Sequence, residues 1–281
     1  MSRMSQRPSY LRVFLAFARN SLVRDMTFRA NFLIETFSSM SWVFMNLGFY
    51  LLIFRYTPMI GAGTGWGKHQ FLLFFATTLL INSLVHAFFM RNAHEFSELI
   101  RTGTLDFALV KPIDTQFLVS LTRVEWSSLA NFAVGLAVLG YSLWKVDYMP
   151  GPVQLALYPI YVLCGVAILY SLMISLAASA VWLGRNQTLY NFWFYITNFS
   201  RYPMEIYQGT FGDPIRWLFT FLIPVLVAVN VPARLLVRPL DPKSPEDWLL
   251  PLFAIVATAG SLAASRWVFN RSLLSYRSAS S

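Results

Sequence analysis

The sequence predicts an all-α membrane protein whose chain crosses the bilayer several times. An α-helix needs about 20 mostly apolar residues to cross a bilayer core. Apolar residues make up 56% of the 281-residue chain and charged residues only 12%, so helices built from it have no polar face to offer water. Seven stretches contain no Asp, Glu, Lys or Arg: 36–54, 69–90, 126–144, 148–184, 186–200, 217–233 and 248–265. We therefore expect a single polytopic membrane domain over residues 1–281.

The first element, residues 9–30, is expected to be a basic amphipathic helix. Its apolar residues recur at spacings of three and four and share one helical face, whereas Arg12, Arg19 and Arg24 lie off that face. Such a helix lies in the headgroup plane with its arginines toward anionic lipid. A short cytosolic helix packed on the base of the protein is the alternative.

Six membrane-spanning helices are expected from the order of the apolar stretches. The first four cover 32–54, 70–90, 126–144 and 153–183, and the last covers 248–269. Both ends of the chain are basic, which favours an even number of spans with both termini in the cytoplasm. The fifth span is ambiguous, because residues 186–207 and 214–237 are both long enough to cross.

Prolines decide the interpretation of the segment 208–240. Pro224 and Pro232 each remove a backbone donor, and Pro203 precedes the segment. We predict that this segment enters the membrane and returns to the outer face, with these three prolines as hinges and 186–207 as the fifth span. This choice places 14 Lys and Arg residues on the cytoplasmic side and 8 outside, whereas a crossing at 214–237 gives 16 and 6, so charge slightly favours the alternative.

The segment 91–118, between the second and third spans, is too polar for the membrane. Phe96, Leu99 and Ile100 fall on one side of a short helix, and Gly103 suits the left-handed conformation that ends many helices. The pattern predicts a compact cytoplasmic helix. A docking surface and a plain interfacial loop both fit it.

Two motifs resemble a known family. The run Glu98-Leu-Ile-Arg-Thr-Gly-Thr-Leu-Asp-Phe-Ala-Leu-Val-Lys-Pro112 resembles the I-x-x-G-x-L-D-x-x-L-x-K-P signature of ABC-2-type export permeases. Downstream, Tyr202-Pro203 to Tyr207, Phe221 to Pro224 and Val231 to Leu236 resemble the Y-P-x-x-I-Y, F-x-I-P and P-A-x-x-L-L tail of a bacterial subgroup. The resemblance covers nearly the whole chain and implies the membrane half of an ATP-driven exporter in the bacterial inner membrane.

The resemblance also implies partners and a coupling site. A separate ATPase subunit would hold ATP and magnesium, a second permease (the same chain or a homologue) would complete the substrate path, and lipid would surround both. Residues 98–112 would be the coupling helix. Leu99, Leu105 and Leu109 would fill a groove of the ATPase, and the residues that set the register and the turn would be Glu98, Arg101, Gly103, Asp106, Lys111 and Pro112.

Other sites are not supported by the motifs. The run Ala62-Gly-Thr-Gly-Trp-Gly-Lys-His69 fails as a phosphate loop at its first and last positions, and His94-Glu-Phe-Ser-Glu98 lacks the second histidine of a zinc-protease helix. Cys164 is the only cysteine. The basic residues flank apolar runs and form no stripe for nucleic acid. We therefore expect no catalytic, metal or cofactor site in this chain.

The ionisable residues near the spans are interpreted as structural. Glu35 and Glu125 lie near cytoplasmic helix ends, His86 is expected to be a hydrogen-bonded residue of the second span, and Arg201 is expected to pair with Glu205 at i, i+4. Two other functions stay open. An ion-gradient-driven secondary transporter would need internal repeats and midplane carboxylates, and a membrane enzyme of lipid-linked substrates would need convergent acids or metal ligands.

Overall fold

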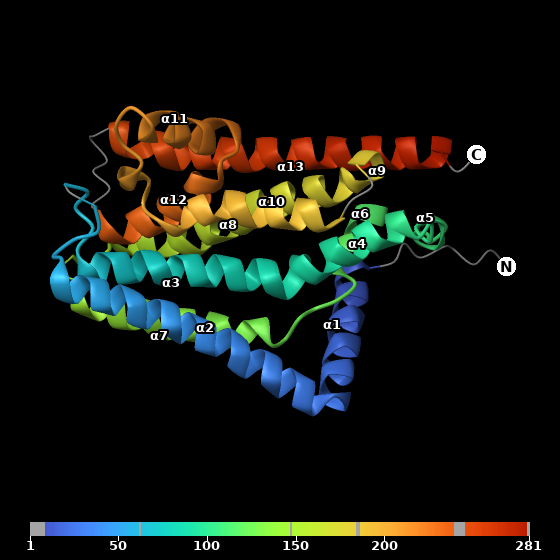
Figure 1. Ribbon diagram of the computed structural model, residues 1–281, viewed down its shortest axis with the longest axis horizontal. Helices are drawn as coiled ribbons and strands as arrows, with labels where there is room; N and C mark the ends of the chain where they lie inside the picture. Colours follow the sequence, from blue (N-terminus) through green and yellow to red (C-terminus); the bar gives the residue numbers. More distant parts are fainter. Residues whose placement is uncertain (1–8, 62, 147, 184–185, 239–244, 280–281) are drawn as a thin grey trace.

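The computed structural model describes residues 9–61, 63–146, 148–183, 186–238 and 245–279. Every regular element in these ranges is a helix, which confirms the all-α prediction. The long helices run side by side along the longest axis of the molecule, and α1 (Tyr10–Thr27) crosses one end of them nearly at right angles (Figure 1). The basic residues Arg3 and Arg7 lie outside the described ranges.

Helix α1 is fixed to the base of the protein along one side. The Ser21 hydroxyl accepts a hydrogen bond from the Val124 backbone N–H at 3.1 Å, and the Trp126 indole N–H donates to the Ala18 carbonyl at 3.2 Å. Leu11 and Leu15 on the same helix stay exposed. Both sequence interpretations therefore find support, because α1 packs on the protein and still presents apolar side chains at a right angle to the spans.

Four of the described helices are long and apolar enough to cross a membrane. These are α2 (Arg29–Tyr56), the continuous helix Lys68–Arg101, the helix Pro152–Leu183 and Asp247–Tyr276 within α13 (Pro245–Ala279). Two shorter helices, α7 (Ser128–Lys145) and α10 (Asn186–Asn198), lie alongside them (Figure 1) but do not meet that criterion of length and apolarity. The polytopic membrane fold is confirmed, and the count of six spans stays a prediction.

The second span does not end where the sequence suggested. Helix α3 (Lys68–Val85) continues through a π-helical turn, η1 (His86–Met90), into α4 (Arg91–Arg101). The span and the first residues of the expected coupling segment, up to Arg101, are thus one continuous helix of 34 residues. Arg91 and the polar residues after it do not interrupt this helix, because they lie beyond the apolar part.

The core forms where α3, α8 (Pro152–Ala178) and α12 (Val225–Val237) meet. Helix α8 starts at Pro152 behind a cap in which the Gly151 N–H donates to the Gln154 side-chain oxygen at 2.7 Å. At the centre, a Cβ atom on Gly165 would lie 2.3 Å from the Ala228 carbonyl oxygen. Only glycine lets α8 and α12 approach this closely.

The segment after α10 forms the predicted pair of bent helices. Helix α11 (Gly212–Trp217) and the π-helical turn η4 (Leu218–Leu222) meet α12 at an angle of 89°. The pair returns to the end at which it starts. The Arg238 carbonyl, directly after α12, accepts a hydrogen bond from Gln154 at the start of α8, and α11 lies at this same end of the molecule (Figure 1). The bent pair fits either a re-entrant loop or one broken span, so the re-entrant segment and the crossing at 186–207 stay predictions. Residues 239–240 of the predicted segment lie outside the described residues.

The three proposed hinge prolines have different places. Pro224 lies at the bend and precedes α12, and Pro203 separates the short helices η2 (Phe199–Arg201) and η3 (Met204–Ile206). Pro232 lies inside α12, so the prediction of a hinge there is wrong. Pro232 cannot donate to the Ala228 carbonyl, and α12 nevertheless continues through it to Val237.

Candidate docking surface and intramembrane cavity

The segment between α4 and α5 (Asp106–Leu109) turns sharply at one end of the bundle. Gly103 has φ of +70°, the left-handed conformation expected from the sequence. Its N–H donates to the Ile100 carbonyl at 3.2 Å, and the Thr104 N–H donates to the Leu99 carbonyl at 3.0 Å, so two carbonyls of the last helical turn are bonded. The turn therefore depends on the backbone of Gly103, and a Cβ there would meet no neighbour within 4 Å.

The apolar anchors predicted for the docking segment do not all face outward. Leu105 is fully buried in the core of this chain, and Leu99 and Leu109 are partly buried against it. The prediction that Leu105 fills a groove of a partner is therefore wrong. Its side chain holds the segment onto the bundle, because the turn at Gly103 directs it inward.

Two other apolar side chains of this segment are exposed instead. Phe107 is 73% exposed and Val110 is 80% exposed. They lie on either side of the buried Ala108, in a helix of a single turn. A spacing of three residues places side chains on the same helical face, so Phe107 and Val110 form an apolar pair on the surface.

The polar residues of the docking segment surround this pair. Arg101 forms an ion pair with Glu98 at 2.8 Å, and Asp106, Lys111 and Pro112 are exposed. The expected coupling residues other than Leu99, Leu105 and Leu109 are thus exposed or partly exposed. We call this surface, residues 98–112 with Phe107 and Val110 at its apolar centre, the docking surface.

A hydrogen-bond network links the docking surface to two spans. Asp114 begins α6 (Thr115–Leu121) by accepting from the Phe117 N–H at 2.9 Å, and it forms an ion pair with Arg266 of α13 at 2.6 Å. Arg266 also donates to Gln116, whose amide donates to the Tyr170 hydroxyl of α8 at 3.1 Å. The hydrogen bond from Arg266 holds the pKa of the Asp114 carboxyl below its ordinary value.

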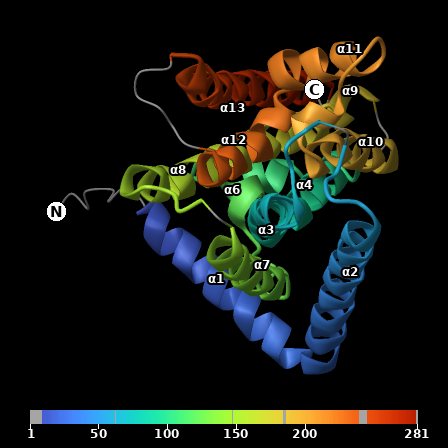
Figure 2. The same ribbon diagram turned by 90° about the vertical axis from the view of Figure 1, so that its left-hand side faces the viewer.

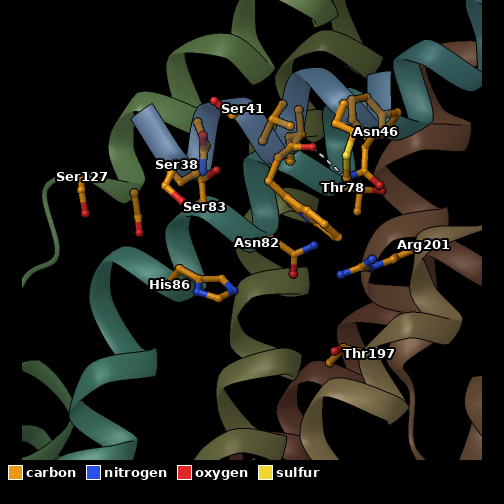
Figure 3. Close-up of a pocket in the computed structure, with 18 of the residues that line it drawn as sticks. Ser38, Ser41, Asn46, Thr78, Asn82, Ser83, His86, Ser127, Thr197 and Arg201 are labelled. Atoms are coloured by element: carbon orange, nitrogen blue, oxygen red, sulfur yellow. Dashed lines mark hydrogen bonds between the residues drawn. The ribbon is translucent and has the colours of Figure 1, made fainter. Parts of the chain in front are cut away.

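A cavity of about 840 Å³ opens between α2, α3, α7 and α10. Its polar side chains come from every wall. Figure 3 shows Asn82 and His86 from the second span and Arg201 from the opposite side pointing toward the same space. The labelled polar residues of its lining are Ser38, Ser41, Asn46, Thr78, Asn82, Ser83, His86, Ser127, Thr197 and Arg201.

The aromatic part of the cavity wall comes from α2, α3 and α10. Trp42, Phe75 and Phe194 line it, together with Trp193, whose ring contacts the His86 ring with centroids 6.1 Å apart. His86 starts the π-helical turn η1, and turns of this kind occur frequently at functional sites. The cavity therefore combines apolar surface with a small number of polar groups, which is typical of small-molecule sites.

Arg201 does not pair with Glu205 as predicted. One Glu205 carboxylate oxygen accepts hydrogen bonds from Arg234 at 2.7 Å and from Arg238 at 3.0 Å. Pro203 separates Arg201 from Glu205, so the two residues never share the helix that an i, i+4 pair requires. Arg201 lies instead over the Phe194 ring, with its guanidinium carbon 5.4 Å from the centroid.

The carboxylates of the lining are Glu35, in the first two turns of α2, and Glu125, just before α7. Glu125 directly precedes the start of the third predicted span, and its backbone N–H donates to the Ala87 carbonyl of η1 at 2.8 Å. Burial raises the pKa of the Glu125 carboxyl, and the nearby Arg91 opposes that rise. The positive charge of Arg91 therefore acts on the Glu125 carboxylate.

Polar residues inside the first two spans are a sequence signal for the cavity. Ser38, Ser39, Ser41 and Asn46 interrupt the first span, and Thr78, Asn82 and Ser83 interrupt the second. Polar side chains inside spans face the protein interior or a water-filled cavity. Their concentration in two consecutive spans predicts a shared polar space between those spans.

Comparison with known proteins gives one match. Residues 40–280 match a family model described as "ABC-2 family transporter protein". No curated protein matches the chain. No solved structure matches it.

Proposed function

The chain belongs to the ABC-2 family of transporter proteins, and from this premise we propose that it is the membrane subunit of an exporter driven by a separate ATPase. ATP and magnesium would be held by that subunit. The docking surface would receive the ATPase, and the cavity would be part of the substrate path. Such a protein moves its substrate across the membrane and catalyses no reaction of its own.

The exposed pair Phe107 and Val110 is the observation on which this proposal rests. Both side chains are more than 70% exposed in a short helix beyond the end of the second span. An apolar centre surrounded by Arg101, Asp106 and Lys111 is the usual anatomy of a protein interface. In a membrane protein, a surface of this kind at the helix ends suits a water-soluble partner better than lipid tails.

The proposal includes a second permease and an orientation. Helix α2 stands apart from the other spans over much of its length (Figure 2), and its large apolar side chains are mostly exposed. Lipid and a second permease, identical or homologous, would share this surface. The docking surface and both termini would be cytoplasmic, in the inner membrane of a bacterium. An ion-gradient-driven secondary transporter and a membrane-embedded enzyme of lipid-linked substrates are the alternatives, and no feature of the described residues favours either.

Co-purification with a co-expressed candidate ATPase subunit tests the proposal. The tagged chain, solubilised in mild detergent, should retain that ATPase in a complex with two permeases and two ATPase subunits. ATP hydrolysis by the complex should exceed that of the ATPase alone. Recovery of a lone permease, with ATP hydrolysis unchanged by its presence, would contradict the proposal.

Cysteine labelling tests the orientation separately. In a Cys164→Ser background, Gly63→Cys should react in intact cells with a reagent that does not cross membranes, because the loop between α2 and α3 lies at the outer end. Thr102→Cys should react only after the cells are opened. Labelling of Thr102→Cys in intact cells would place the docking surface outside, where no ATP is available.

A further inference from the structure

We propose that the cavity binds an amphipathic organic anion, with the acidic group of the ligand at Arg201 and its apolar body along the aromatic wall. This inference deepens the proposed function, since it names the substrate class of the exporter. It depends on the export function only in treating the cavity as part of the substrate path. The binding chemistry itself follows from the residues that line the space.

Arg201 supplies the charge for an anion. The only acidic residue near it in sequence, Glu205, is already bonded to two other arginines. Within the described part of the chain, no carboxylate lies within ion-pair distance of Arg201. A guanidinium is always charged, and it forms two parallel hydrogen bonds with a carboxylate, sulfonate or phosphate group.

Neutral polar groups surround the same end of the cavity. Asn82 lies between His86 and Arg201 and points into the space that they share (Figure 3). Its side-chain amide can donate to an anionic oxygen, and Thr197 lines the wall one helical turn before Arg201.

Apolar surface accounts for the rest of the ligand. Trp42 of α2, Phe75 of α3 and Phe194 of α10 line the cavity, and its volume of about 840 Å³ suits a molecule of drug size. Phe194 lies directly under the guanidinium of Arg201. An acidic group bound at Arg201 would therefore place the adjoining part of the ligand against an aromatic ring.

The cavity also holds two carboxylates, Glu35 and Glu125. The charges of Arg91 and Glu35 both act on the Glu125 carboxyl, in opposite directions. Within the described residues neither Glu35 nor Arg201 takes part in an ion pair, so the lining carries charge of both signs. Arg201 is its guanidinium group, and Asn82 and His86 point toward the same space (Figure 3). The proposal therefore places the anion at Arg201, and the charge-selective test below distinguishes it from a cation held by the carboxylates.

Charge-selective cysteine modification tests the proposal on the chain alone in lipid nanodiscs. A cysteine in place of Asn82, in the Cys164→Ser background, is treated with a sulfonate-bearing or a trimethylammonium-bearing methanethiosulfonate. The ratio of the two rates should be at least about tenfold higher with Arg201 or Arg201→Lys than with Arg201→Gln. Ser128→Cys, at the carboxylate end, is the matched control, and its ratio should not respond to Arg201→Gln.

A protection measurement adds ligand binding to the same experiment. Naphthalene-2-sulfonate should slow modification of Asn82→Cys by neutral methyl methanethiosulfonate, and naphthylmethylammonium, of similar size, should not. Protection by both compounds equally, or protection that persists in Arg201→Gln, would overturn the proposal. Because no ATPase is present, failure here leaves the coupling proposal intact, and failure of co-purification leaves this result intact.

Discussion

Replacing Phe107 by Asp tests the docking surface most directly. A large aromatic side chain buries about 150–250 Å² when it is fully covered. Since Phe107 is 73% exposed, a partner that covered it would remove roughly 110–180 Å² from water, which corresponds to at most about 3–4.5 kcal/mol. Part of that gain is lost to ordering and imperfect fit, so we expect about 2 kcal/mol per docking surface, or about a thirtyfold weaker association.

The assay is the affinity of the detergent-solubilised permease for the purified ATPase, measured by biolayer interferometry. Phe211→Asp is the matched control, because Phe211 is 87% exposed at the opposite end of the molecule. It should leave the affinity unchanged, and both variants should elute as the same folded species in size exclusion. An affinity for Phe107→Asp within about twofold of the parent would refute the assignment of Phe107 as an apolar anchor. Leu105→Asp, by contrast, should fail to fold, because that side chain is buried in the core.

Three further predictions concern stability and coupling. Gly103→Val should reduce ATPase association while leaving the spans intact, because a β-branched residue resists φ of +70° although nothing crowds the site. Co-purification measures the association, and a normal yield of ATPase would show that docking does not need the left-handed turn at Gly103. Asp114→Asn should lower thermal stability by about 1 kcal/mol or less, since its pairing with Arg266 is partly exposed. The pKa of Asp114 is lower in the folded protein than the ordinary value of 3.8. The ionised carboxylate therefore stabilises the fold above that value, and this contribution is lost as pH falls through the folded pKa. The Asp114→Asn variant should lose less stability than the parent protein on acidification below about pH 4. Gly165→Ala should lower the unfolding temperature by the equivalent of about 1–3 kcal/mol, because its Cβ would meet the Ala228 carbonyl. Gly260→Ala is the control and should leave the unfolding temperature unchanged, because open space surrounds that site. Equal unfolding temperatures for both variants would contradict the close packing of α8 on α12.

The fold could be predicted from the sequence where one physical rule dominated. Charge-free runs located the four helices that are long and apolar enough to cross a membrane, because burial of charge in lipid is costly. Gly103 and Pro224 marked a helix end and a bend through their backbone restrictions. The rule failed at Pro232, which lies inside α12 without ending it. The local sequence cannot show this, because α12 is held in the core by contacts between residues far apart in the chain, such as the close approach of Gly165 to Ala228.

The motif located the docking segment in the sequence, but it did not show which of its side chains point outward. The pattern of leucines is the same whether they point into the core or toward a partner, and only the turn at Gly103 decides that Leu105 points inward and Phe107 outward. The cavity escaped prediction for a similar reason. Arg201 and Glu205 have a spacing that favours a pair, and only the folded chain brings Arg234 and Arg238 to Glu205 and leaves Arg201 to the cavity.

The continuity of the second span has a mechanical consequence. His86, in the cavity wall, and Arg101, beside the docking surface, are joined by helix alone, without an intervening loop. Fifteen residue steps at about 1.5 Å each fix their separation at roughly 22 Å. A loop would absorb an axial displacement, whereas a helix resists compression and extension. A displacement imposed at Arg101 along the helix axis is therefore transmitted to the cavity wall at His86. The π-helical turn that begins at His86 is the one irregular part of this helix, so a bend of the helix is expected there.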